Sequence, residues 1–318
     1  MLQVSLKKLP SINTKHMSNE DWLNIRQNSI GGSDAGTILG FNKYDSPLSL
    51  YSKKIGDLET EDISNKMPVK FGNYLEDFVA KCFEEETGKK VRNHNYMMYH
   101  PDYDFISANV DKVVIGENAI LECKTASEFK KKDWADGNVP GSYMAQCYHY
   151  MLVTGVERVY IAVVFGNSTF QWTTIERDEE VIQSILEQEI NFWQNHVQKR
   201  IPPEVDGSKA TGEALNKLWK DTSDEEIKLD DKAELLKSWH AIRVQRERLD
   251  KEETEIKNKL KEIMEDKEKG TTENFKVTWK KQKRKSIDTK RLKKEHPDIA
   301  DQYMKESESR VFKISEVN

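Results

Sequence analysis

Short apolar runs alternate with longer amphipathic segments along residues 1–205, and Gly and Pro separate many of them. Apolar runs rich in β-branched residues predict strands, and apolar positions at steps of three and four predict helices. Strands are expected at 104–115, 119–125, 158–165 and 169–175. Helices are expected at 19–28, 34–40, 46–54, 70–87, 142–154 and 178–199. The pattern predicts a mixed α/β domain over residues 1–205.

Beyond residue 205 the pattern becomes that of a charged helix. Apolar residues recur at steps of four and three, which is a heptad stripe, and Lys, Arg and Glu surround them. Arg246 and Glu253 are the polar interruptions. The other positions of the stripe are Leu235, Trp239, Ile242, Leu249, Ile256, Leu260 and Ile263. We expect a long charged helical or coiled-coil segment over residues 206–270.

The last segment, residues 271–318, is expected to form a small basic α+β tail. FKVTW (275–279) and RVFKI (310–314) have the composition of strands, and a short helix is expected between them at about 288–305. Between Lys276 and Lys294 the only acidic residue is Asp288. Such a run is either a solvated face or a patch for DNA phosphates or an acidic partner.

Composition limits the class of protein. The chain has a formal net charge of −5, 33% charged residues and a mean hydropathy of −0.79. There is no apolar run of about 18 residues, so we expect no membrane span, and the N-terminal residues lack the apolar core of a secretory signal. The three cysteines show no CxxC spacing, which favours a reducing cytoplasm and no zinc or iron–sulfur site.

The stretch AILECKT (119–125) carries a carboxylate and an ammonium in an otherwise apolar or small run. Side chains alternate faces along a strand, so Glu122 and Lys124 share one face. If Gly116 and Glu117 form a two-residue hairpin loop, Asp111 lies opposite Glu122, about 4.5–5.5 Å away. A loop one residue longer makes the pair diagonal. Two carboxylates at either spacing repel unless a divalent cation such as Mg²⁺ or Mn²⁺ lies between them.

This pattern has two interpretations. An isolated E-x-K is usually an ordinary salt-bridged strand with an exposed face. The preceding Asp favours the second interpretation, in which the carboxylates hold a metal ion and Lys124 orients the water that the metal makes acidic. That arrangement suits hydrolysis of a phosphodiester.

At these residues the chain resembles a known family. Asp111 followed by Glu122-Cys123-Lys124 is similar to the D…(D/E)xK core of the PD-(D/E)xK nucleases. The surrounding motifs resemble the phage lambda-type alkaline exonucleases and the YqaJ-like viral recombinases, in family order over roughly residues 20–200. These motifs are WLNIRQNSIGGSDA (22–35), KFGNYLEDFVAKCFEEETG (70–88), SYMAQCYHYMLVTG (142–155) and TTIERDEEVI (173–182). The resemblance implies a PD-(D/E)xK fold, with a mixed central sheet flanked by helices.

The resemblance also implies the residues of a catalytic metal site. Asp111, Glu122 and the main-chain carbonyl of Cys123 would be metal ligands, and Lys124 would position the attacking water. Glu76 would reach a second metal, or its water shell, from a helix. Without the resemblance, Glu76 would be interpreted as a charged residue on a helix surface.

Four further residues would contact DNA. Gln146 and Tyr150, four apart on one helix face, would line the site near the DNA backbone, although a helix-packing pair gives the same spacing. Arg26 and Ser33 match the family's pocket for a terminal 5′-phosphate. Arg suits phosphate because its guanidinium is a forked, permanently charged donor, and the free amides of a helix starting in GGSDAG (31–36) would favour an anion.

The function implied is that of a Mg²⁺-dependent exonuclease, with Mn²⁺ as a substitute metal. It would digest one strand of linear double-stranded DNA from the 5′ end and leave a 3′ overhang for a single-strand annealing protein in phage-type recombination. Relatives form closed rings around DNA, so a homo-oligomeric ring is expected. The setting would be the cytoplasm of a bacterial host, with a phage or prophage gene.

Two alternatives stay open. The D…ExK core alone also fits an endonuclease or a repair nuclease of the same superfamily, and a 5′-phosphate pocket at Arg26 and Ser33 is what separates an end-processing enzyme from these. The heptad helix and basic tail also fit a scaffold that binds DNA or an annealing protein and carries a degenerate nuclease domain.

Overall fold

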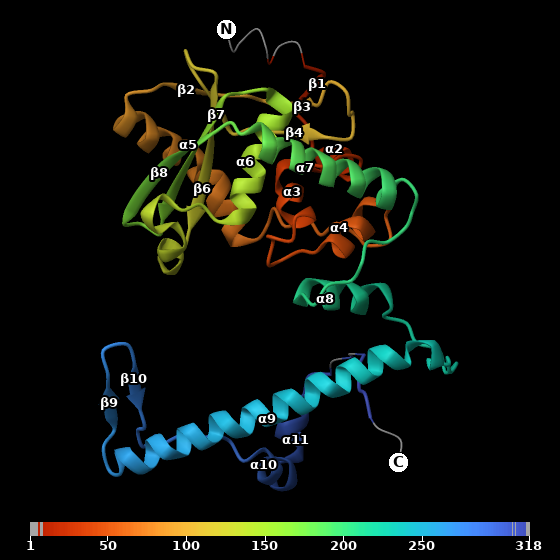
Figure 1. Cartoon of the computed structure of the whole chain (residues 1–318), viewed down its shortest axis with the longest axis vertical. Helices are drawn as coiled ribbons and strands as arrows, with labels where there is room; N and C mark the ends of the chain where they lie inside the picture. The colour runs from red at the N-terminus through yellow and green to blue at the C-terminus, as the bar shows by residue number, and fades with distance from the viewer. Residues whose placement is uncertain (1–5, 7–8, 307, 309, 316–318) are drawn as a thin grey trace. The chain divides into compact units, whose positions relative to one another are not determined.

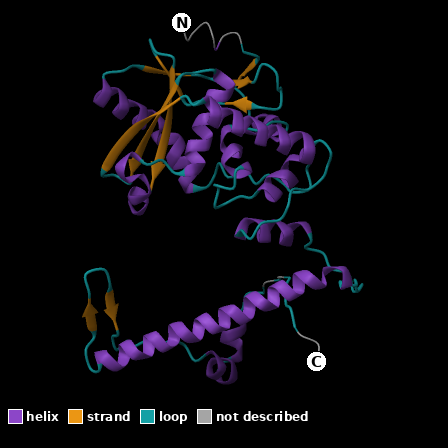
Figure 2. Ribbon diagram, in the orientation of Figure 1, coloured by secondary structure: helices purple, strands orange, loops and turns teal. Residues whose placement is uncertain are grey.

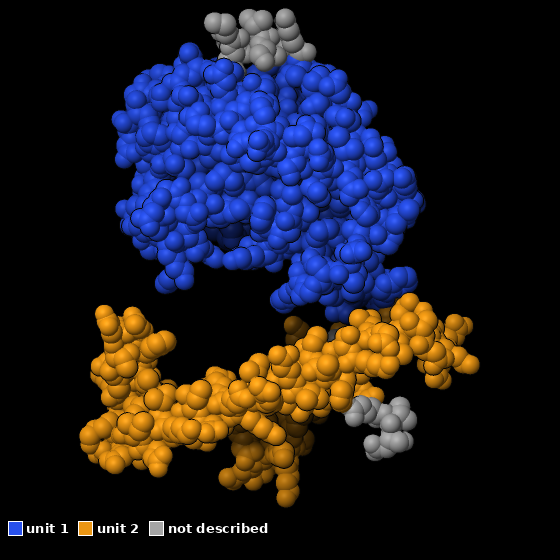
Figure 3. Space-filling view, viewed as in Figure 1, with its two compact units in different colours: residues 1–220 blue, residues 221–318 orange. Residues whose placement is uncertain are grey.

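The structure is a computed structural model that describes residues 6, 9–306, 308 and 310–315 (Figures 1 and 2). The chain forms two compact units, residues 1–220 and 221–318, coloured separately in Figure 3. The division falls after the boundary expected at 205 because helix α8 (Lys209–Leu218) belongs to the first unit. Its buried Ala210 and Ala214 lie on the side that meets helix α4 (Pro47–Lys54).

The first unit is built around a mixed five-stranded sheet, as expected. Its order is β2-β5-β6-β7-β8. Strands β6 and β7 are parallel, and all other neighbours are antiparallel. The strands are β2 (Val91–Asn93), β5 (Lys112–Val114), β6 (Ala119–Ala126), β7 (Arg158–Phe165) and β8 (Thr169–Glu176).

Both faces of the sheet are covered, which explains the unbroken apolar run of β7. Its residues Val159, Ile161 and Val163 point into the larger core, and Tyr160, Ala162 and Val164 point into a smaller one. Helix α5 (Met67–Thr87) closes the smaller core with Val79 and Phe83.

The other helices of this unit lie close to their predicted ranges. They are α2 (Asn19–Gln27), α3 (Gly32–Ile38), α6 (Gly141–Thr154) and α7 (Glu179–Asn191), which continues as a π-helix over Phe192–Val197. A 3₁₀ segment over Glu128–Gly137 precedes α6. Helices α3 and α6 pack closely at Gly36, where an added Cβ would lie 3.0 Å from the Cα of Ser142.

The strand predicted at 104–115 is wrong as a single element. It divides into β4 (Ser107–Ala108) and β5, which belong to different sheets. β4 joins β1 (Ser11–Asn13) and β3 (Tyr96–Tyr99) in a small three-stranded sheet. The chain leaves one ladder and enters the next across residues 109–111, so Asp111 lies at the point where the backbone changes sheets.

The second unit contains the long helix predicted from the heptad stripe, α9 (Ala233–Met264). Leu235, Ile242 and Ile256 of the stripe are exposed on it. Pairing of this helix into a coiled coil stays a prediction. None of the described helices has the length and apolar character to cross a membrane.

The tail after α9 differs from the prediction in two places. FKVTW supplies strand β10 (Lys276–Thr278), which pairs with β9 (Lys269–Thr271). The helix expected at 288–305 is two helices, α10 (Thr289–Glu295) and α11 (Pro297–Gln302), because Pro297 has no N–H to continue the first. The strand predicted at RVFKI (310–314) is wrong, since these residues pair with no other strand of the described chain.

Candidate active site

The β5–β6 hairpin brings Asp111 and Glu122 together. The paired residues are Lys112 with Leu121 and Val113 with Ile120, and the next step of this register sets Asp111 opposite Glu122. The register expected from a turn at Gly116 is therefore confirmed; Gly116 has a φ of 86°, a value that favours glycine. One oxygen of Asp111 accepts the N–H of Cys123 at 2.8 Å, which fixes the carboxylate beside the backbone of β6.

A polar network connects β6 to helix α6. The Lys124 ammonium donates to one oxygen of Glu122 at 2.5 Å and to the side-chain oxygen of Gln146 at 3.0 Å. The amide nitrogen of Gln146 donates to that same Glu122 oxygen at 2.9 Å and to the Tyr150 hydroxyl at 2.7 Å. Gln146 thus holds the Glu122–Lys124 pair in place, and Tyr150, on the same helix face, holds Gln146.

Burial makes the negative charges of this network energetically costly. Burial, together with the negative charge of Glu122, raises the pKa of Asp111 to about 7. The second oxygen of Glu122 is buried and has no hydrogen-bond partner among the described residues. Burial favours a neutral Lys124, but the charges of Glu122 and Asp111 outweigh it and raise the pKa of the ammonium. Two carboxylates and one firmly charged ammonium therefore share a buried site.

These features suit a divalent cation with oxygen ligands. An unpaired buried carboxylate oxygen and a second carboxylate that burial drives toward protonation would both be relieved by a positive ion. Across the described residues, no group of three or more His, Cys, Asp or Glu side chains is arranged to hold a metal ion. Mg²⁺ needs only one or two carboxylates, since it keeps several of its waters.

The third predicted carboxylate, Glu76, lines the same cleft and forms an ion pair with Lys112. Lys112 has a nearly buried side chain and donates to Glu76 at 2.6 Å and to Asp77 at 2.7 Å. Burial, followed by the charge of Asp111, raises the pKa of Glu76, so this carboxylate lies within the electrostatic reach of the site. Glu76 therefore lines the cleft from helix α5, with its charge balanced by the lysine that follows Asp111.

One cleft of about 350 Å³ contains all the predicted site residues. The carboxylates and Lys124 form one part of its wall, and Arg26 and Ser33 form another. Gly32 lets the two parts approach each other, because a Cβ there would lie 2.5 Å from a ring carbon of Tyr150.

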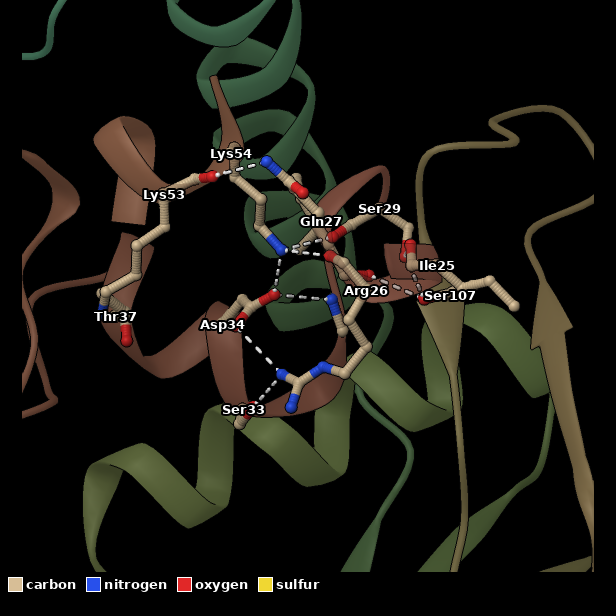
Figure 4. Close-up of polar contacts among 12 residues, drawn as sticks. Ile25, Arg26, Gln27, Ser29, Ser33, Asp34, Thr37, Lys53, Lys54 and Ser107 are labelled. Atoms are coloured by element: carbon tan, nitrogen blue, oxygen red, sulfur yellow. Dashed lines mark hydrogen bonds and ion pairs between the residues drawn. The ribbon is translucent and has the colours of Figure 1, made fainter. Parts of the chain in front are cut away.

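Figure 4 shows how Arg26 is held at this wall. Its guanidinium donates to the Ser33 hydroxyl at 2.7 Å and pairs with Asp34 at 3.3 Å. It also lies 4.8 Å from the ring centroid of Trp22, one helical turn earlier on α2. The amides expected to favour an anion are partly used, because Asp34 accepts the N–H of Gly31 at 3.0 Å.

A buried lysine, Lys54, holds Arg26 and Asp34 in position. Lys54, at the end of α4, donates to the carbonyls of Arg26 and Ser29 and to the Asp34 carboxylate, at 2.6–2.8 Å (Figure 4). Burial alone would raise the pKa of Asp34, but the Lys54 and Arg26 charges outweigh it and lower the pKa to about 2. The Asp34–Lys54 pair therefore fixes both the backbone and the side chain of Arg26.

Replacing Lys54 with Met is expected to destabilise the protein by about 3–5 kcal/mol, because it leaves Asp34 charged and two carbonyls without their donor. Lys53→Met is the matched control. Its ammonium makes one ion pair with Asp45, and its side chain is 29% exposed against 5% for Lys54. That change should cost about 0–1 kcal/mol. Urea unfolding of both variants measures the difference, and equal losses would contradict the role of Lys54.

Sequence reasoning missed four residues of this site: Trp22, Asp34, Lys54 and Lys112. Trp22 carried a usable signal, since it precedes Arg26 by four residues on a helix and therefore shares its face. Lys54 and Lys112 carried none, because their partners are brought to them only by the packing of α4 and α5.

Comparison with known proteins assigns the family. The YqaJ-like viral recombinase domain matches residues 21–157, which include every predicted site residue. A curated relative, the uncharacterized protein YqaJ of Bacillus subtilis (strain 168), is 41% identical over 307 residues, covering 95% of this chain and 96% of the relative. The chain belongs to the YqaJ-like viral recombinase family. The match to the relative also extends over the second unit.

Solved structures give weaker likenesses. LHK-Exo of Laribacter hongkongensis, an alkaline exonuclease solved with dAMP, is 19% identical over 57% of this chain and 94% of its own, with a TM-score of 0.49. A putative exonuclease of Eubacterium rectale is 13% identical over 68% of this chain and 97% of its own, with a TM-score of 0.45. Both scores lie below 0.5, so no conclusion about this chain rests on them.

Proposed function

We propose that this protein is a metal-dependent deoxyribonuclease with a PD-(D/E)xK core, and that it degrades one strand of linear double-stranded DNA in the 5′-to-3′ direction. One observation carries the proposal. A single cleft joins the Asp111–Glu122 pair and its lysine to an Arg26–Ser33 pair suited to phosphate. The family's description as a viral recombinase agrees with a role in DNA processing.

The residues divide the chemistry among them. Asp111, Glu122 and the carbonyl of Cys123 would hold Mg²⁺, or Mn²⁺ in its place, with Glu76 reaching a second ion or its waters. The bound metal supplies an acidified water and neutralises charge on the phosphodiester. Lys124 donates a hydrogen bond that orients the attacking water and stabilises the charge that develops on the phosphate. Gln146 and Tyr150 keep the Lys124–Glu122 pair aligned.

The Arg26–Ser33 pair is the reason for proposing an exonuclease and not an endonuclease. The Arg26 guanidinium is held in place by Ser33, Asp34 and Trp22, so it is ordered before any phosphate binds. Its forked donors suit a terminal phosphate. An enzyme that cuts within a strand gains nothing from such a group. The remaining 3′ strand would pass to a single-strand annealing protein, and a homo-oligomeric ring would keep the enzyme on its DNA.

Two other functions are less well supported. An endonuclease or repair nuclease would use the same carboxylates and leave Arg26 without a role. A scaffold with a degenerate nuclease domain would have no need of the ordered Glu122–Lys124–Gln146 network.

The test is digestion of linear duplex labelled separately at each 5′ and 3′ end, with either a 5′-phosphate or a 5′-hydroxyl. The wild type should release 5′ label first and prefer the phosphorylated end, by about 10–100-fold for one charge-assisted contact of 1.5–3 kcal/mol. Arg26→Gln should remove most of this preference and retain cleavage. Equal rates on both ends with the wild type would favour the endonuclease.

A further inference from the structure

The β9–β10 hairpin, which follows the C-terminal end of α9 (Figure 1), has two unlike faces. Phe275, Val277 and Trp279 alternate along β10 and share one face, on which the partner of Val277 is Gly270. Phe275 is 74% exposed and Trp279 is 46% exposed. Because Gly270 has no side chain, this face is a flat platform with two accessible aromatic rings.

The opposite face and the chain that follows are basic. Lys269 and Lys276 lie on that face with two threonines, and residues 276–294 contain ten Lys and Arg against one acid, Asp288. That acid caps α10 by accepting the N–H of Arg291 at 2.9 Å. The segment therefore presents a dense, exposed positive charge beside the aromatic platform.

These charges differ from those of the ion-paired basic residues on α9. On α9, five basic side chains pair with glutamates three or four residues away, as in Arg243–Glu247 at 3.2 Å and Lys257–Glu253 at 2.6 Å. Within the described chain, Lys280, Lys281 and the 283–285 cluster form no ion pair. Ion pairing along the helix accounts for these five side chains and does not apply to the 280–285 cluster.

We propose that residues 269–294 bind single-stranded DNA. Unpaired bases stack on the Phe275–Trp279 face, and the basic face and residues 280–285 follow the phosphates. Stacking on exposed aromatic rings next to a positive track is how proteins hold single strands without reading their sequence, and the bases of an intact duplex are not available for it. The choice of DNA as the polyanion rests on the proposed function, which produces such a strand.

The test measures binding by the full-length protein in EDTA, so that cleavage plays no part. Fluorescence anisotropy follows a labelled oligothymidine of about 20 nucleotides, longer than one site of about 4–16 nucleotides, over a range of KCl concentrations. A charge variant carries Gln at Lys280, Lys281, Lys283 and Arg284. Its matched control carries Gln at the ion-paired Arg243, Arg248, Lys257 and Lys259.

The slope of log K against log salt is negative, and in the charge variant it should become shallower by about 0.7 for each phosphate that is no longer neutralised. The control should leave the slope unchanged. Phe275→Ala with Trp279→Ala should weaken binding about 5–150-fold per stacked base, with no change in slope. Trp279→Phe should restore most of the affinity at that position. Tyr303→Ala, at another exposed ring, should have no effect.

Two results would overturn the proposal. One is an equal change of the slope in the charge variant and its control, and the other is indifference of the affinity to the aromatic substitutions. Because these measurements exclude metal, their failure would leave the nuclease proposal standing. Conversely, a failure to detect cleavage in other experiments would not contradict the proposed binding of single-stranded DNA by residues 269–294.

Discussion

Lys124→Ala is expected to slow single-turnover DNA cleavage by roughly 10³-fold, the range seen when a charge-stabilising or proton-positioning group is removed. The ammonium donates to Glu122 at 2.5 Å, and the surrounding carboxylates raise its pKa, so it stays charged through the pH range of the assay. Metal binding, followed by calorimetry, should persist because both carboxylates remain.

Cys123→Ala is the matched control for that variant. The Cys123 side chain packs with the smaller core, and only its main chain faces the proposed metal site. The cleavage rate of the Cys123→Ala enzyme should therefore stay within about threefold of wild type, because the change removes one sulfur atom from the core and leaves the main chain in place. A Lys124→Ala enzyme that cleaves as fast as the Cys123→Ala enzyme would remove Lys124 from the mechanism.

Asp111→Asn is expected to abolish metal-dependent cleavage and also to stabilise the metal-free protein above neutral pH. The pKa of Asp111 is raised from 3.8 to about 7, chiefly by burial. Between these values the folded protein keeps a proton that the unfolded chain has released. The free energy of unfolding therefore falls as pH rises from about 4 to about 7, on the order of 1.4 kcal/mol per pH unit.

Asparagine removes that loss because it has no proton to release, and its carbonyl can still accept the Cys123 N–H. Thermal unfolding in EDTA should thus show a higher Tm for the variant at about pH 8 and a much smaller difference at about pH 4. Added Mg²⁺ should raise the Tm of the wild type alone, because only an intact carboxylate pair binds the ion. The exposed Asp104→Asn should match wild type throughout. An Asp111→Asn protein that Mg²⁺ stabilises as much as wild type would rule out Asp111 as a ligand.

The sequence was most informative where one local rule governed the outcome. A glycine turn and the two-residue period of strands placed Asp111 opposite Glu122, and the structure has that register. The spacing of Gln146 and Tyr150 put both on one helix face, and Gln146 bonds to Tyr150 as well as to Glu122. These relations involve neighbours along one strand, one hairpin or one helix.

It was least informative where tertiary packing decides. Nothing near Lys54 marks it as the support of Arg26, since its three acceptors lie at least 20 residues away in sequence. The pairing of Glu76 with Lys112 depends on how α5 docks against β5. The split of the 104–115 run depends on two competing sheets, a choice that strand propensity does not encode.

The most direct test of the account is whether the wild-type protein, with Mg²⁺, digests linear duplex DNA and spares covalently closed circles of the same sequence. The account predicts complete dependence on Mg²⁺ or Mn²⁺, loss of the linear substrate alone, and no digestion by Asp111→Asn. Cleavage of closed circles, cleavage in EDTA, or equal activity of Asp111→Asn would contradict it.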